Sequence, residues 1–121
     1  MRFRPILAAV TATMLLGCGG KEENAAPPLC SVSAPTSCPS PAPRFADVRP
    51  IIQQTCAGPC HSGTDPAGPW PLTDYEHVAD WADVVRADLL DCSMPPADAG
   101  VTLSAENRLF ILNWLRCGYP E

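Results

Sequence analysis

Two cysteines and a histidine lie close together in the run Cys56-Ala57-Gly58-Pro59-Cys60-His61, and a methionine follows in the run Met94-Pro95-Pro96. Thiols can be alkylated by the vinyl groups of a haem, and a histidine fixed beside them can ligate its iron. The usual attachment motif is C-x-x-C-H, and the spacing here is C-x-x-x-C-H, one residue longer. A thioether favours ferrous iron and raises the reduction potential. The sequence therefore contains the parts that a c-type haem needs.

Met94 is well suited to be the distant ligand. The other methionines, Met1 and Met14, lie in the first residues of the chain, which we expect to be removed. A single remaining methionine, placed before two prolines that fix φ, is not routine core filler. His77 is the other histidine of the chain. We expect it on the surface of a helix, and it would be the substitute ligand if Met94 did not serve.

Two other interpretations of the same residues stay open. Cys56 and Cys60 could form a disulfide with His61 incidental, in a haem-free, disulfide-stapled envelope lipoprotein that acts as a binding or structural module. These three residues could also join a further thiol in a zinc or copper site, although the other half of a zinc-finger pattern is absent. Neither interpretation gives Met94 a role.

The N-terminus has the pattern of a bacterial export signal. Arg2 and Arg4 precede an apolar stretch over residues 6–16, which is too short to span a bilayer. The run Leu15-Leu16-Gly17-Cys18 resembles a lipobox, which implies cleavage of a signal peptide over residues 1–17 and lipid on Cys18. The next residue is not aspartate, which favours the outer membrane, facing the periplasm. The alternative is an ordinary secretory peptide with an incidental cysteine.

The remaining cysteines suggest a disulfide framework. Export places them in an oxidising compartment, where free thiols seldom persist. If haem takes Cys56 and Cys60, we expect Cys92 to pair with Cys117 and tie the methionine loop to the last helix. Cys30 and Cys38 would then pair within the linker. Six cysteines allow fifteen pairings, so the connectivity stays open.

Composition divides the rest of the chain into two parts. Residues 18–43 are rich in proline, alanine and serine, which predicts a disordered, lipidated tether. Residues 44–121 form a domain so small that an unaided core is marginal, and a covalently held haem would complete it. The net charge of −5 disfavours nucleic acid and suits a neutral or basic redox protein as partner.

The domain is predicted to be all-α, with about three short helices and long loops between them. The first covers about residues 46–55 and tolerates Pro50 only in its first turn. The second begins at a capping box of Thr73 and Glu76 and reaches about residue 89. The third begins at Ser104 and stops at Gly118. Its expected buried residues are Phe110, Ile111, Trp114 and Leu115.

The order of these motifs resembles small class I cytochrome c domains, most closely the planctomycete- and myxobacterial-type haem c domains with a Met-Pro-Pro distal motif. The resemblance covers about residues 45–120. It implies a small cytochrome c-like fold around one haem c, with thioethers to Cys56 and Cys60, His61 as proximal iron ligand and Met94 as distal iron ligand. It implies outer-sphere electron transfer and no enzymatic activity, because an iron ligated on both sides has no open position.

Overall fold

Helices make up the whole regular structure of the described residues, which are 32–64 and 68–121 in the computed structural model of the protein. The helices are α1 (Phe45–Ile52), a π-helical continuation η1 (Gln53–Ala57), α2 (Tyr75–Asp80), α3 (Ala82–Leu90) and α4 (Ala105–Arg116). No strand occurs in these two ranges, so the all-α prediction is confirmed. None of the described helices is long and apolar enough to cross a membrane. The expected signal peptide, Cys18 and Cys30 lie outside the described residues.

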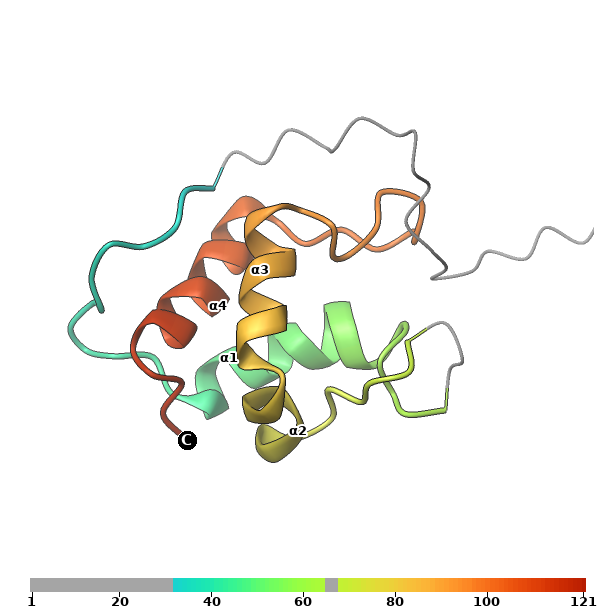
Figure 1. The fold of residues 1–121 in the computed structure, drawn as a ribbon, viewed down its shortest axis with the longest axis horizontal. Helices are drawn as coiled ribbons and strands as arrows, with labels where there is room; N and C mark the ends of the chain where they lie inside the picture. The colour runs from blue at the N-terminus through green and yellow to red at the C-terminus, as the bar shows by residue number, and fades with distance from the viewer. Residues whose placement is uncertain (1–31, 65–67) are drawn as a thin grey trace, which may run out of the picture.

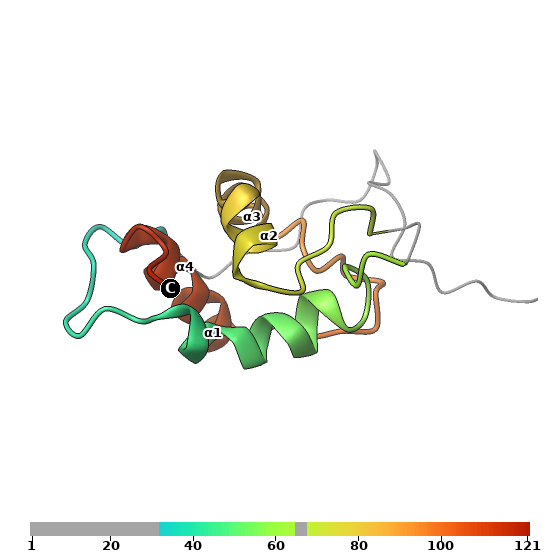
Figure 2. The same cartoon turned by 90° about the horizontal axis from the view of Figure 1, so that it is seen from below.

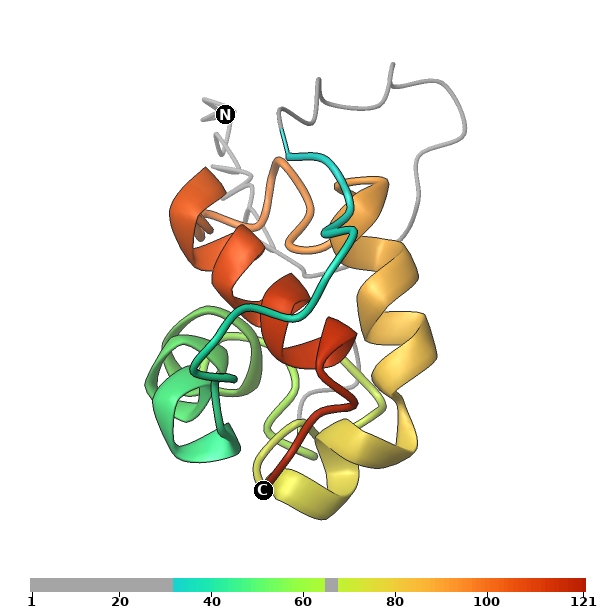
Figure 3. The same cartoon turned by 90° about the vertical axis from the view of Figure 1, so that its left-hand side faces the viewer.

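The core is built around α4, which packs against α1 on one side and α3 on the other (Figures 1 and 3). Trp114 at its centre is 0 % exposed. Its ring lies 5.8 Å from that of Phe45 and 6.1 Å from that of Tyr119, measured between centroids. Burying a large apolar side chain stabilises a fold by roughly 1.5–3 kcal/mol. Figure 2 shows α1 and α3 on opposite sides of the molecule. The described parts of the loops that follow η1 and α3 lie together at one end.

The first helix differs from its prediction at Pro50. Val48 and Ile52 are buried in the core. However, α1 begins at Phe45, which places Pro50 inside the helix and not in its first turn. Proline has no N–H to donate to the carbonyl four residues earlier, so the helix lacks one bond there. The chain continues in π-helical form until Gly58 donates to the Gln53 carbonyl at 2.8 Å.

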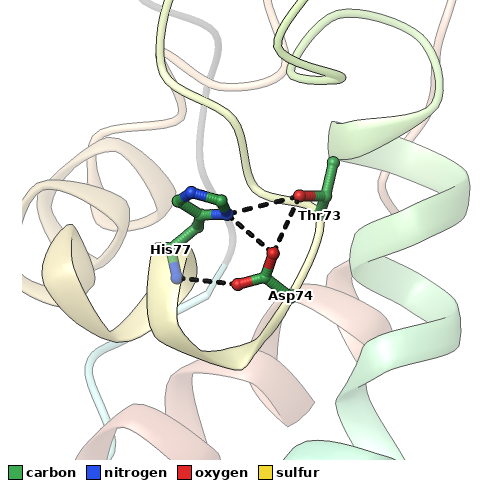
Figure 4. A network of polar contacts seen from close by, with 3 residues as sticks. All are labelled: Thr73, Asp74 and His77. Carbon is green, nitrogen blue, oxygen red and sulfur yellow. Dashed lines mark hydrogen bonds and ion pairs between the residues drawn. The ribbon is translucent and has the colours of Figure 1, made fainter.

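The second predicted helix is two helices, because the backbone breaks at Trp81 (φ −108°, ψ 15°) between α2 and α3. The predicted capping box is also wrong. The N-cap is Asp74, whose Oδ1 accepts a hydrogen bond from the His77 amide at 3.1 Å (Figure 4). A carboxylate at this position accepts hydrogen bonds from the free amides of the first turn. The N-cap is therefore Asp74 and not Thr73, and the helix begins one residue later than predicted.

The predicted limits of the last helix are confirmed. The Ser104 hydroxyl accepts from the Asn107 amide at 3.1 Å, as an N-cap does. Gly118 has φ 81°, and the amides of Gly118 and Tyr119 donate to the carbonyls of Leu115 and Trp114 at 3.2 and 3.0 Å. This pairing closes the C-terminus in a Schellman motif.

The predicted buried face of α4 is only partly right. Ile111, Trp114 and Leu115 are buried as expected, whereas Phe110 is only half-buried. Leu112 and Arg108 are the buried residues that the prediction missed.

Residues 32–43 lie against the helical domain, although the sequence predicts a tether up to residue 43. Cys38 forms a disulfide with Cys117, with a Cα–Cα distance of 4.9 Å. The Arg116 guanidinium donates to the Thr36 carbonyl at 3.0 Å, and Val32 packs against the core. Figure 3 shows this segment crossing over α4. The described part of the expected tether is therefore attached to the domain.

Candidate functional site

One apolar pocket brings together all four residues expected to hold a haem, namely Cys56, Cys60, His61 and Met94. Its cavity volume is about 70 Å³, and the space between its walls, open mouth included, is about 720 Å³. Small-molecule sites are mostly apolar and usually measure some 300–1,000 Å³, so the pocket has the apolar character of such a site with a smaller cavity. The remaining lining is largely hydrophobic and comprises Thr55, Trp70, Leu72, Trp81, Val84, Val85, Asp88, Leu89, Pro95 and Pro96.

Cys56 lies in η1, and Cys60 and His61 lie on the tight turn that follows it. The amides of Cys60 and His61 both donate to the Cys56 carbonyl, at 3.2 and 2.9 Å. The extra residue between the cysteines is thus accommodated by a closed turn. The inserted residue does not move the second cysteine or the histidine away from the pocket, since both line it.

The imidazole of His61 is oriented by the loop that follows it. Its Nδ1 lies 2.8 Å from the carbonyl oxygen of Trp70. A carbonyl can only accept, so the hydrogen bond requires the proton on Nδ1 and leaves the lone pair of the neutral ring on Nε2. Histidines that ligate metals usually donate their other ring N–H to a carbonyl or carboxylate. The ring is therefore in the tautomer that a metal ligand needs.

Glycine at position 68 lets this loop pass directly over the turn. A Cβ built on Gly68 would collide with the backbone carbonyl of Cys60 and would lie 3.2 Å from the amide nitrogen of His61. The Leu72 amide donates to the His61 carbonyl at 2.9 Å and closes the loop. The position of His61 thus depends on a close backbone approach that a larger residue would prevent.

Met94 enters the pocket from the loop after α3, and the Arg108 guanidinium holds this loop. Its Nη1 donates to the Met94 carbonyl at 3.0 Å and to the Leu89 carbonyl at 2.9 Å. Arg108 is 8 % exposed, and burial lowers the pKa of its guanidinium below the ordinary value. Arg108 is not among the site residues that the sequence predicted. Its signal was a charged residue in the apolar stripe of α4, three positions before Ile111 and four before Leu112.

The cysteines of the described residues differ in whether they form a disulfide. Cys56 is free, and burial raises the pKa of its thiol, so it is protonated at neutral pH. Cys60 and Cys92 are each disulfide-bonded. The partner of Cys117 is Cys38, so the expected pairs of Cys92 with Cys117 and of Cys30 with Cys38 are wrong. The reason is that residues 32–43 return along α4 and bring Cys38 to the helix end.

Two tryptophans form the mouth of the pocket. The rings of Trp70 and Trp81 stack with centroids 4.7 Å apart and an interplanar angle of 25°. Trp70 is 46 % exposed and Val84 is also exposed, so the mouth is apolar but open to solvent. An exposed apolar surface of this kind often borders a ligand or partner site.

His77 lies away from the pocket, as expected for a surface histidine. It is exposed, and its Nδ1 lies 2.7 Å from Asp74 Oδ2 and 3.3 Å from the Thr73 hydroxyl (Figure 4). Within residues 32–64 and 68–121, no three His, Cys, Asp or Glu side chains cluster in a way that could hold a metal ion.

Comparison with known proteins adds no relative. No family model matches the chain, and no curated protein or solved structure is similar to it at a significant level.

Proposed function

We propose that the protein is a lipid-anchored, mono-haem c-type cytochrome with a cytochrome c-like fold that carries single electrons in the bacterial cell envelope. The observation that supports this function is the convergence of Cys56, Cys60, His61 and Met94 on one apolar pocket. When bound, the haem would supply an iron that alternates between the ferrous and ferric states. His61 would ligate it through Nε2 and Met94 through its sulfur, which leaves no open position for a substrate.

The two cysteines would hold the haem by thioethers. In each addition the sulfur bonds to one vinyl carbon and the thiol proton moves to the other, so no oxidant is consumed. Cys56 already has a free, protonated thiol. Cys60 is disulfide-bonded, and a thioether and a disulfide are alternative states of one sulfur. Attachment at Cys60 therefore requires prior reduction by an external dithiol.

The remaining features fit an electron carrier at a membrane surface. Lipid on Cys18 would anchor the chain. The proposed location is the outer membrane, with the protein facing the periplasm. The net charge of −5 suits a neutral or basic redox protein as donor or acceptor and disfavours nucleic acid.

Covalent haem can be tested directly. The full chain, with its own signal peptide, would be produced in a bacterium that co-expresses a cytochrome c maturation system. A denaturing gel stained for haem peroxidase activity should show colour at the protein band. The double variant C56S/C60S should lose the colour, because the haem then has no covalent link.

A matched control removes two cysteines elsewhere. The double variant C38S/C117S lacks the disulfide at the end of α4 but keeps both pocket cysteines, so its band should still stain. Exported and fully matured wild-type protein without covalent iron porphyrin would overturn the proposal.

The second candidate is a haem-free, disulfide-stapled envelope lipoprotein with a binding or structural role. The observation in its favour is that Cys38, Cys60, Cys92 and Cys117 are all disulfide-bonded. The two candidates predict different masses after maturation. A haem adds its own mass and removes Cys60 from any disulfide, whereas the second candidate retains the disulfide of Cys60 and the free thiol of Cys56.

A further inference from the structure

Arg108 is the buried cation that connects α4 to the segment carrying Met94. Its Nη1 reaches two carbonyls that belong to different parts of the chain, Leu89 at 2.9 Å and Met94 at 3.0 Å. Leu89 lies in the last turn of α3, where carbonyls have no partner within the helix. A guanidinium at that end satisfies such a carbonyl and interacts favourably with the helix dipole. One side chain therefore fixes the distance between the end of α3 and Met94.

Met94 is also held through its amide, which donates to the Asp88 carbonyl at 3.3 Å. The preceding residue, Ser93, donates from its hydroxyl to Asp88 Oδ1 at 3.1 Å and from its amide to Asp91 Oδ1 at 2.9 Å. These contacts all lie on the α3 side of the loop. The Arg108 contact links Met94 to α4.

The charge of Arg108 is paired with two backbone carbonyls. The ion pairs between side chains of the described residues are His77 with Asp74 and Arg86 with Asp83, and neither involves Arg108. The Asp91 carboxylate acts on it electrostatically and partly offsets the effect of burial on the pKa of the guanidinium. Burial of a charge costs free energy unless its donors are well paired, so the two carbonyl contacts explain why this residue is tolerated in the apolar stripe of α4.

We infer that Arg108 is a positioning residue that holds Met94 at the pocket and thereby sets the strength of its bond to iron, an inference that rests on the proposed function. Without Arg108, Met94 keeps its amide contact to the Asp88 carbonyl in α3 but loses its hydrogen bond to α4. The thioether would then be displaced more easily by another ligand. The residue does not touch the iron and acts through the backbone of Met94.

The inference is tested with the haem-loaded full chain and imidazole, which competes with Met94 for the iron. The variant R108Q should stain for haem like the wild type but bind imidazole about tenfold to about a hundredfold more tightly, because a hydrogen bond from a charged group is lost. R108K keeps the charge but not the planar fork of donors, so its affinity for imidazole should lie between those of the wild type and R108Q. Wild-type affinity in R108Q would overturn the inference.

A second experiment asks whether Arg108 acts through Met94. In the M94A background, R108Q should change imidazole affinity no further, because the residue that Arg108 positions is already gone. A further change of the same size would show a general effect on the pocket and would overturn the inference. R116Q is the matched control: it removes the same charge from the same helix, where Arg116 contacts Thr36 and not the pocket, and its affinity should equal that of the wild type.

The outcomes separate this inference from the proposed function. Absence of haem stain in the wild type overturns both, whereas stain with unchanged affinity in R108Q overturns the inference alone. If neither Arg108 variant accumulates with haem, the inference can still be tested by unfolding the wild type with guanidinium chloride. The absorption band of the thioether–ferric bond should then vanish in the same transition as the helical signal, and its earlier loss would overturn the inference.

Discussion

The Nδ1 atom of His61 lies 2.8 Å from the carbonyl oxygen of Trp70, nine residues further along the chain. This hydrogen bond fixes the orientation of the imidazole and leaves Nε2 as the atom available to a ligand. The intervening loop crosses directly over the Cys60 backbone at Gly68. The histidine of the pocket is therefore positioned by a loop whose path depends on a glycine.

Gly68→Ala should destabilise the site. The added Cβ would overlap the Cys60 carbonyl, and backbone on both sides leaves no flexible group to move away. We expect a loss of about 1–3 kcal/mol in the free energy of unfolding, as for other overpacked positions, together with a lower yield of attached haem. Denaturant titration and the haem-stained gel measure the two effects.

Gly100→Ala serves as the control for this substitution. Gly100 has φ 69°, and a Cβ there meets nothing within 4 Å. An alanine there is strained only by its left-handed backbone conformation, which should lower the free energy of unfolding by about 1–2 kcal/mol. Haem attachment should be unchanged. Equal haem yields in both variants would contradict a special role for the close approach at Gly68.

Met94→Ala should leave the haem attached but lower its reduction potential. A thioether ligand favours the ferrous state, so its loss should lower the potential by on the order of 0.1 V, within the roughly 0.8 V that axial ligands span. A redox titration followed by absorption measures the shift. His77→Ala should leave the potential unchanged, because His77 is exposed and does not line the pocket. A shift in that variant with none in Met94→Ala would exchange the roles of the two residues.

Removal of the disulfide between Cys38 and Cys117 should destabilise the domain by about 2–5 kcal/mol, because it closes a long loop of the unfolded chain. We expect the double variant C38S/C117S to show a lower denaturation midpoint and faster proteolysis between residues 32 and 43. R116Q, which loses only the contact to the Thr36 carbonyl, should cost less than about 1 kcal/mol. Protection of residues 32–43 in the double variant would show that other contacts hold this segment.

Acid should weaken the N-terminus of α2. The His77 amide, which donates to Asp74, lowers the pKa of this carboxyl below its unfolded value. Its stabilising effect is therefore present above the unfolded pKa of about 3.9 and is lost as the pH falls through the lower, folded pKa. Between about pH 5 and about pH 2.5, the denaturation midpoint should fall more in the wild type than in D74N. Asparagine keeps an N-cap acceptor without titrating, so parallel pH profiles would contradict this role.

Local patterns predicted the helical framework well, because caps and apolar periodicity act over short distances. Ser104 and Gly118 bound α4 as expected. The same patterns failed at Trp81 and Pro50, where packing against other elements outweighs local preference. A helix break at a tryptophan has no sequence signal comparable to that of proline or glycine.

The pairing of cysteines could not be predicted for a different reason. Cys38 and Cys117 are separated by 79 positions, and their proximity depends on how residues 32–43 return over α4. Spacing along the chain carries no information about such a return. Composition alone predicted a tether for that segment and did not register its contacts with the helices.

The types and order of the site residues are determined by the sequence alone: two cysteines, a histidine that follows the second one, and a methionine before two prolines. Only the tertiary structure placed Met94 across one pocket from His61 and revealed the Arg108 guanidinium that holds it. The physical reason is that chemistry resides in individual side chains, whereas their convergence depends on long-range packing of α3 and α4 and on the burial of a charge. Neither the packing of α3 and α4 nor the burial of the Arg108 charge is encoded in the spacing of a motif.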